Sequence, residues 1–263
     1  GDANTVIGYQ AGDAIDDGEN NTVLGRHALG ANITGDLNVA IGVSALSSFI
    51  GNASVAIGRE ALRDANHAST ADGAVAVGTG ALAAMTSSPN NTAVGYQAGG
   101  VTTGGYNTYV GYQAGKGASG AEANNTAVGN QALTAVTDGG FNTVLGTEAG
   151  HDLTTGDENV FIGLNAGDKT TNVDRTVIIG ANAGGAIMTS DADGTIAIGY
   201  EAGIAITSGQ HNTYIGFNAG KADATGRYNT IMGSDAGKVL VGNGSGEADY
   251  NTFVGWNAGI AAT

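Results

Sequence analysis

NTVIGYQAG, the stretch from Asn4 to Gly12, recurs with variations fifteen times along the 263 residues of this chain. Each copy is anchored by a glycine, and successive anchors lie 16 to 22 residues apart, most often 17. Self-similarity at a short, nearly fixed period is typical of a solenoid, in which each repeat adds one coil to a stack. We therefore expect an all-β fold, a parallel β-roll or β-solenoid of about 15 coils. The anchors are Gly8, Gly25, Gly42, Gly58, Gly78, Gly95, Gly111, Gly129, Gly146, Gly163, Gly180, Gly199, Gly216, Gly233 and Gly255.

The residues just before each anchor predict a short β-strand. Counting from the anchoring glycine, position −1 is aliphatic or Met in every copy, and we expect its side chain to point into a core. Position −2 is apolar as well, so both faces of the strand are apolar, because neighbouring strand residues face opposite ways. Position −3 is Thr in nine copies and Val or Ile in six, a β-branched set that favours extended backbone.

The other constant positions predict how each coil closes. Position −4 is Asn in eleven copies, and stacked coils would place these amides in a ladder. The anchor suits a sharp bend or a close approach of backbone, and Ala at position +3 in every copy suggests a second short strand that turns inward. We expect the repeat to be built, in four representative copies, by Asn4, Ile7, Gly8 and Ala11, by Asn91, Val94, Gly95 and Ala98, by Asn142, Leu145, Gly146 and Ala149, and by Asn251, Val254, Gly255 and Ala258.

The repeats run from end to end, so we expect residues 1–263 to form one β-roll domain, a fragment or a subunit of a longer fibre. A coil this thin buries little apolar surface alone, and a strand that is apolar on both faces can fill its own coil with one and meet sister chains with the other. A homotrimer fits this pattern best. Because no cap is visible at either end, a head-to-tail extracellular filament is an alternative.

Four phrases carry a resemblance to known families. NVAIGVSAL (Asn38 to Leu46) and SVAIGREAL (Ser54 to Leu62) resemble the head repeat of trimeric autotransporter adhesins. NTAVGYQAG (91–99) and NTYVGYQAG (107–115) are similar to repeats of phage tail-fibre proteins and long bacterial surface proteins. The resemblance covers essentially the whole chain and implies a left-handed parallel β-roll, a homotrimer, and a role as a rigid spacer or host-binding fibre. It carries no ligand residues over, since no binding motif of these families matches.

Composition narrows the partners and the location. With 24 acidic and 9 basic residues the net charge is −15, which repels nucleic acid and anionic lipid. There is no cysteine and no apolar run long enough to span a bilayer, so we expect neither disulfides nor membrane insertion. We expect a structural, adhesive fibre that is extracellular, on a cell surface or on a virion. Its partners would be copies of itself and a host-surface glycan or protein receptor.

No catalytic motif is visible, so we expect no enzyme and no catalytic residues. A fibre-borne glycan depolymerase is an alternative, because acidic loop residues could form a carboxylate pair in a groove between chains. The acidic candidates are Asp152, Asp157 and Glu158. The histidines lie in four different repeats, without metal-motif spacing, and are His27, His67, His151 and His211.

Two acidic, glycine-containing loops could bind Ca²⁺, although the EF-hand spacing and the nine-residue calcium repeat are both missing. We expect no other cofactor or metal. The loops carry Asp13, Asp16, Asp17 and Glu19, and Asp191 and Asp193.

Surface chemistry leaves three further expectations. Aromatic residues at position +1 either cover the next coil or stack on sugars, and are Tyr9, Tyr96, Tyr112, Tyr200, Phe217 and Trp256. Acceptor triplets for N-glycosylation occur at Asn20, Asn32, Asn52, Asn90, Asn124 and Asn243. An ice-binding solenoid is a last alternative, but the Thr row at position −3 is interrupted in six copies, and we expect it to be buried.

Overall fold

The computed structural model describes residues 3–64, 72–85, 89–117, 122–240 and 248–259. The chain divides into two compact units, Gly1–Val128 and Gly129–Thr263. Each unit is a parallel β-solenoid, in which every repeat contributes one strand of three residues that ends at position −1. Within the described ranges the only helical segment is the 3₁₀ turn η1, Ser190–Ala192. The predicted all-β parallel solenoid is confirmed.

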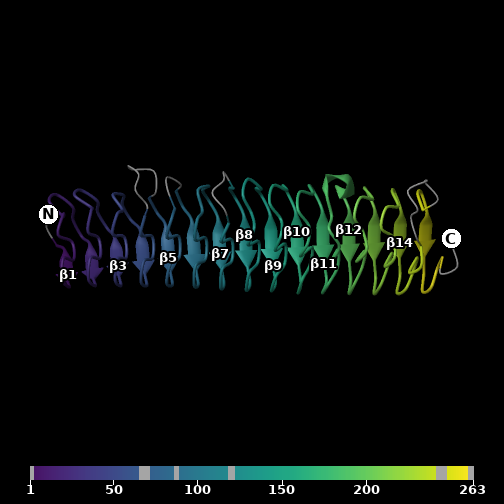
Figure 1. Ribbon diagram of the computed structural model, residues 1–263, viewed down its shortest axis with the longest axis horizontal. Helices are drawn as coiled ribbons and strands as arrows, with labels where there is room; N and C mark the ends of the chain where they lie inside the picture. The colour runs from purple at the N-terminus through teal and green to yellow at the C-terminus, as the bar shows by residue number, and fades with distance from the viewer. Residues whose placement is uncertain (1–2, 65–71, 86–88, 118–121, 241–247, 260–263) are drawn as a thin grey trace. The chain divides into compact units, whose positions relative to one another are not determined.

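In the first unit, eight described strands lie side by side in chain order and point the same way (Figure 1). Neighbouring strands pair without any shift in register, so that Thr22 lies beside Val39, and Val39 beside Val55. The strands are β1 Thr5–Ile7, β2 Thr22–Leu24, β3 Val39–Ile41, β4 Val55–Ile57, β5 Val75–Val77, β6 Thr92–Val94, β7 Thr108–Val110 and β8 Thr126–Val128.

The second unit repeats this arrangement with seven described strands. Val160 pairs with Thr143 on one side and with Val177 on the other, again in parallel and in register. The strands are β9 Thr143–Leu145, β10 Val160–Ile162, β11 Val177–Ile179, β12 Ile196–Ile198, β13 Thr213–Ile215, β14 Thr230–Met232 and β15 Thr252–Val254.

The middle residue of each strand, at position −2, points into the coil. Ala40 and Phe161 are fully buried there, whereas Leu24 and Leu145 at position −1 are 46% and 48% exposed. The expectation that position −1 points into the core of its own coil is therefore wrong. Strand side chains alternate, so positions −1 and −3 share the outer face once position −2 lies inside.

A tight turn follows the anchor, and the predicted second strand is wrong. In the repeat of Gly163, φ is +133° at Gly163, +53° at Asn165 and +60° at Gly167. Left-handed residues that alternate with ordinary ones coil the backbone instead of extending it. The Ala166 N–H donates to the Gly163 carbonyl at 3.3 Å, and the Ala166 side chain is fully buried, which explains why only Ala occurs at position +3.

Positions −2 and +4 share one interior volume. Ala56 at −2 is accompanied by Leu62 at +4, and both side chains are fully buried. Where −2 is aromatic, +4 is glycine, as for Tyr109 and Gly115. A Cβ on Gly115 would lie 2.2 Å from Tyr109 Cδ1, so the ring occupies the space that Leu fills in other coils.

The anchoring glycines let neighbouring coils approach closely. A Cβ on Gly163 would lie 2.7 Å from the carbonyl carbon of Gly180, the next anchor. At Gly255, in the last described strand's repeat, such a Cβ would meet nothing within 4 Å. The glycine is therefore required by stacking as well as by its positive φ.

The predicted amide ladder at position −4 is confirmed, and it joins side chains mainly to backbone. Asn142 Oδ1 accepts a hydrogen bond from the Asn159 N–H at 3.0 Å, and Asn159 Oδ1 accepts one from the Thr176 N–H at 2.9 Å. Asn159 Nδ2 donates to the Val173 carbonyl at 2.7 Å. Each of these amides thus closes its own coil and fixes the next one, which pairs buried polar groups of the backbone.

Candidate interaction surfaces

The outer face of each sheet carries a strip of aliphatic and Thr side chains. Ile57, Val94 and Met232 remain 37%, 37% and 39% exposed, although strands flank each of them on both sides. Contiguous apolar columns of this kind make the outer face a candidate interaction surface. We call positions −1 and −3 together the outer strip. Its −1 residues are Ile7, Leu24, Ile41, Ile57, Val77, Val94, Val110 and Val128 in the first unit, and Leu145, Ile162, Ile179, Ile198, Ile215, Met232 and Val254 in the second.

The Thr row at position −3 lies on this outer strip, so the expectation that it is buried is wrong. Thr22, Thr126 and Thr143 are exposed, and Thr108 and Thr213 are half-buried. The apolar character of position −1 suggested a buried face, but it is the −2 side chains that fill the interior.

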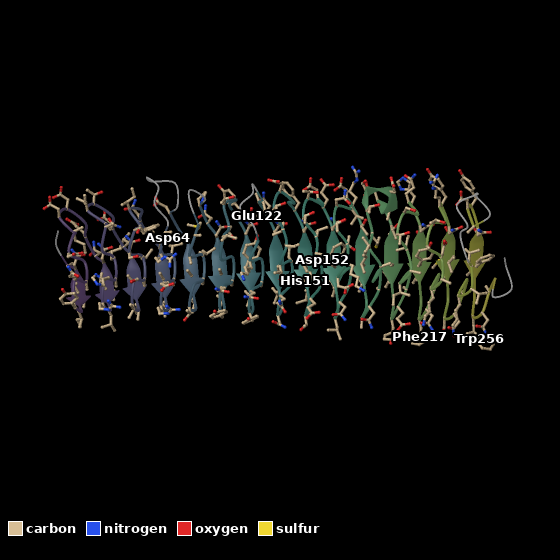
Figure 2. All side chains as sticks on the ribbon, viewed as in Figure 1. Asp64, Glu122, His151, Asp152, Phe217 and Trp256 are labelled. Atoms are coloured by element: carbon tan, nitrogen blue, oxygen red, sulfur yellow. The ribbon has the colours of Figure 1, made fainter. Side chains whose placement is uncertain are left out.

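The aromatic residues at position +1 stack on one another between coils. The ring centroids of Tyr96 and Tyr112 lie 5.4 Å apart with planes 10° from parallel, and those of Tyr200 and Phe217 lie 5.2 Å apart at 13°. Phe217 and Trp256 line the same edge of the second unit (Figure 2). In these pairs the rings cover one another's faces, so they offer mainly edges, rather than faces, to a sugar.

The histidines of the described residues occupy three unrelated settings. His27 meets the ring of Tyr9 edge-on with centroids 5.7 Å apart, and His211 stacks on Tyr228 at 5.4 Å. His151 Nδ1 lies 2.6 Å from Asp152 Oδ1 (Figure 2). His67 lies outside the described residues. No catalytic grouping of histidines forms within the described residues of either unit.

Two of the acidic candidates for a depolymerase, Asp152 and Asp157, have different hydrogen-bond partners. Asp152 pairs with His151, whereas the Asp157 N–H donates to Asp174 Oδ1 at 2.9 Å and Asp174 repeats this contact with Asp193. Asp157, Asp174 and Asp193 therefore form a column of carboxylates bonded to backbone. Burial raises the pKa of the Asp193 carboxyl, and the charge of Asp174 adds to this rise.

The two acidic loops do not gather three carboxylates at one place in the described part of the chain. The N–H groups of Asp16 and Asp17 both donate to the Ile33 carbonyl, at 3.0 and 3.1 Å, so this loop is bonded to the backbone of the next coil. Among the described residues no three Asp, Glu or His side chains are arranged to hold a metal ion.

One carboxyl group is buried in the second unit, where the sequence indicated only a loop. Asp223 Oδ2 accepts hydrogen bonds from Tyr214 Oη at 2.7 Å and Asn229 Nδ2 at 2.9 Å, and Oδ1 accepts from the Gly226 N–H at 2.8 Å. Burial raises the pKa of Asp223 above its ordinary value of 3.8. The signal that could have revealed it is its position, +7, which holds Leu153 and other apolar residues elsewhere.

The acceptor triplets divide by accessibility. Asn20, Asn90 and Asn124 are exposed, each at position −5 with φ of +58°. Asn32 is buried, since its Nδ2 donates to the Gly51 carbonyl at 3.1 Å, so the expectation of a glycan at Asn32 is wrong for the folded chain. Asn52 is half-buried, and its Oδ1 accepts from the Asp36 N–H at 2.9 Å. Asn243 lies outside the described residues.

A shallow cavity of about 240 Å³ crosses the turns of four coils in the first unit. Arg63 and Lys116 line its two ends, and Gln97, Ala84 and Gly100 line the space between. We call this cavity the turn notch. Sequence reasoning missed it, and its trace in the sequence is slight: Ala83 and Gly100 stand at position +5 between the repeats of Arg63 and Lys116.

Comparison of the chain with protein-family models, with curated proteins and with solved structures gives no match. No helix in the described ranges is long and apolar enough to cross a bilayer.

Proposed function

We propose that the chain is part of an extracellular or virion-borne homotrimeric fibre, a rigid shaft or head that attaches to a surface. The observation that supports this proposal most is the outer strip, which runs along the sheet of each unit with half-exposed Ile, Val and Leu. A lone solenoid has no need of such residues, because its core is already filled by positions −2, +3 and +4.

The strip has the shape of a contact between parallel chains. It is three residues, or about 10 Å, wide, and it repeats every ~4.8 Å along the stack. Sister chains that stand side by side with their strips toward a common axis bury these columns over their whole length. The number three comes from the resemblance to adhesin heads and tail fibres.

The mechanism of such a fibre is geometric. Ladders of hydrogen bonds run along the stack, and aliphatic columns join the chains, so the fibre is stiff and resists proteases. Variable turns carry the differences between coils, and three copies of each turn raise the avidity for a repeated receptor such as a polysaccharide.

The outer strip is tested by two matched sets of substitutions in the second unit. Ile162→Lys, Ile179→Lys and Ile198→Lys place three charges on the strip. The control places the same three charges at position +1 of the same coils, a position where Arg26 and Arg59 occur naturally, through Leu164→Lys, Ala181→Lys and Tyr200→Lys.

Sedimentation velocity then compares both variants with the unmodified chain. The strip variant should dissociate at protein concentrations at least roughly a hundredfold higher than the control, because desolvating three charges costs several kcal/mol. If both variants associate as tightly as the unmodified chain, the outer strip is not the interface.

Ice binding is a second candidate, favoured by one observation, the outward Thr row at position −3. Regular exposed Thr on a flat parallel sheet can order water. Six repeats carry Val or Ile instead, and position −1 beside them is bulky, so the row is irregular. Thermal hysteresis of the purified chain decides between the two candidates, because a strip buried in a trimer leaves no hysteresis.

A further inference from the structure

We propose that the turn notch of the first unit binds a carboxylate-bearing sugar, such as a hexuronic acid unit of an acidic polysaccharide. The inference rests on the proposed fibre function, since it names the class of surface ligand that the fibre would meet. It assigns the carboxylate to Lys116 and a hydroxyl group to Gln97, which also lines the notch.

The notch exists because two adjacent coils have small residues where their neighbours have long ones. Position +5 is Ala83 in one coil and Gly100 in the next, whereas Arg63 and Lys116 stand at +5 in the flanking coils. The resulting volume of about 240 Å³ suits one sugar unit. It lies below the ~300 Å³ at which pockets for drug-sized ligands begin.

The charge in the notch comes from Lys116. Arg63 is already paired, with Nη1 at 3.0 Å from Glu60 Oε2 and Nε at 2.9 Å from Asp64 Oδ1. No ion pair joins Lys116 to another described residue. In a chain of net charge −15, an ammonium without a carboxylate partner is a site for an external anion.

The polar and apolar groups of the notch match the rest of a pyranose. Gln97 Oε1 accepts a hydrogen bond from Gln113 Nε2 at 2.9 Å, which orients the Gln97 amide so that its own N–H groups can serve a ligand hydroxyl. Glu60 also lines the notch, but its two oxygens are paired with Arg59 Nη1 at 2.8 Å and Arg63 Nη1 at 3.0 Å. The methyl group of Ala84, another lining residue, suits the apolar side of a sugar ring. No strand residue lines the notch, so a trimer formed through the outer strip leaves its lining residues out of the interface.

Two probes that differ only in the carboxylate test this assignment. Methyl β-D-glucuronide and methyl β-D-glucoside are titrated into the purified full chain, and binding is followed by protein NMR. The glucuronide should bind at least about fivefold tighter, and the gap should shrink as salt is raised, because the charge contact is solvent-exposed.

Three variants localise the contact. Lys116→Gln should weaken glucuronide binding about tenfold and leave glucoside binding unchanged, since one charge-assisted contact is lost. Lys238→Gln is the matched control: Lys238 also stands at position +5, but in the second unit and paired with Asp235 at 3.0 Å, so binding should not change. Ala84→Leu fills the notch and should abolish binding of both sugars. The thermal midpoint of each variant shows that it is folded.

The inference is overturned if the glucuronide binds no tighter than the glucoside, if Lys238→Gln weakens binding as much as Lys116→Gln does, or if Ala84→Leu leaves binding intact. Native mass is measured on the same samples. A trimer that does not bind the glucuronide contradicts the ligand assigned to the turn notch but agrees with the proposed fibre. A monomer that binds the glucuronide supports the assigned ligand and contradicts the proposed fibre.

Discussion

The ring of Tyr109 occupies the space that a side chain on Gly115 would need. A Cβ on Gly115 would lie 2.2 Å from both Cδ1 and Cε1 of the ring. Tyr214 and Gly220 repeat this relationship in the second unit, at 2.3 Å. In these two coils a large side chain at position −2 is therefore compensated by glycine at position +4, which keeps the interior packed without overlap.

This relationship predicts how the two positions respond to exchange. Tyr109→Ala should cost about 3–5 kcal/mol through the cavity it leaves. Gly115→Leu should cost about 3 kcal/mol or more, because the side chain meets the ring and φ at this position is positive. The double variant has Ala at position −2 and Leu at position +4, the pair that Ala127 and Leu133 form in the next coil. It should therefore cost at least about 2 kcal/mol less than the sum of the two single variants. Denaturant unfolding of the four proteins measures this; simple additivity would show that the two positions do not share one volume.

The anchoring glycines predict a difference between an inner coil and the last described one. Gly255→Ala should cost roughly 1–3 kcal/mol, from backbone strain alone. Gly163→Ala should cost roughly 1–3 kcal/mol more, because its Cβ would meet the carbonyl of Gly180 and the coils would have to separate. Thermal unfolding compares them, and equal losses would mean that stacking does not require the glycine.

Much of this fold follows from the repeat, because a residue type that recurs at one position must satisfy the same contacts in every coil. Asn at position −4 predicted the ladder in which Asn159 lies, and β-branched residues at −3 predicted the strands. It was harder to predict which positions of the strand face the interior of the coil. Ile at −1 is larger than Ala at −2, so hydrophobicity alone favoured −1 as the interior, whereas Leu62 at +4 supplies the volume that Ala56 lacks.

Two other features carry little signal in one sequence. The turn after the anchor depends on positive φ at residues such as Glu148 and Asn165, which are not glycine. The turn notch depends on short side chains between Arg63 and Lys116. Such a gap in the surface becomes visible only when the structure shows which residues of neighbouring coils are adjacent.

The amide ladder predicts that Asn159→Asp is poorly tolerated. The new carboxylate keeps the bond from the Thr176 N–H but sets a charged oxygen against the Val173 carbonyl, which Nδ2 now contacts at 2.7 Å. We expect a loss of roughly 3 kcal/mol at neutral pH. The loss should shrink in acid, where a protonated carboxyl can donate to Val173.

Asn165→Asp is the control, since Asn165 Nδ2 donates to Asn182 Oδ1 at 3.1 Å on a partly exposed turn. Its cost should be below about 1 kcal/mol, with little change in acid. Urea unfolding at both pH values gives the comparison, and similar losses for the two variants would argue against the ladder as a stabilising element.

Asp223 predicts a pH dependence for the second unit. Burial raises its pKa in the folded chain above the ordinary value of 3.8, so the folded state favours the neutral carboxyl. This contribution to stability is complete below the unfolded pKa and is lost as pH rises through the folded pKa. Relative to Asp223→Asn, the unmodified chain should therefore gain stability as pH falls from neutral toward 4. Urea unfolding at pH values spaced about one unit apart measures this difference.

Asp235 gives the opposite sign and serves as the reference. A hydrogen bond from Asn218 and one from Lys238 lower the pKa of Asp235, so its contribution is present above 3.8 and is lost as pH falls. Relative to Asp235→Asn, the unmodified chain should lose stability in acid. If both differences run in the same direction, the burial of Asp223 does not control its titration.

Native mass spectrometry of the unmodified chain tests the central claim most directly. An interface along the outer strip predicts a single assembly of three copies of the 25.7 kDa chain that persists on dilution. A species of 25.7 kDa at all concentrations would contradict the account, because the aliphatic columns at position −1 would then face water.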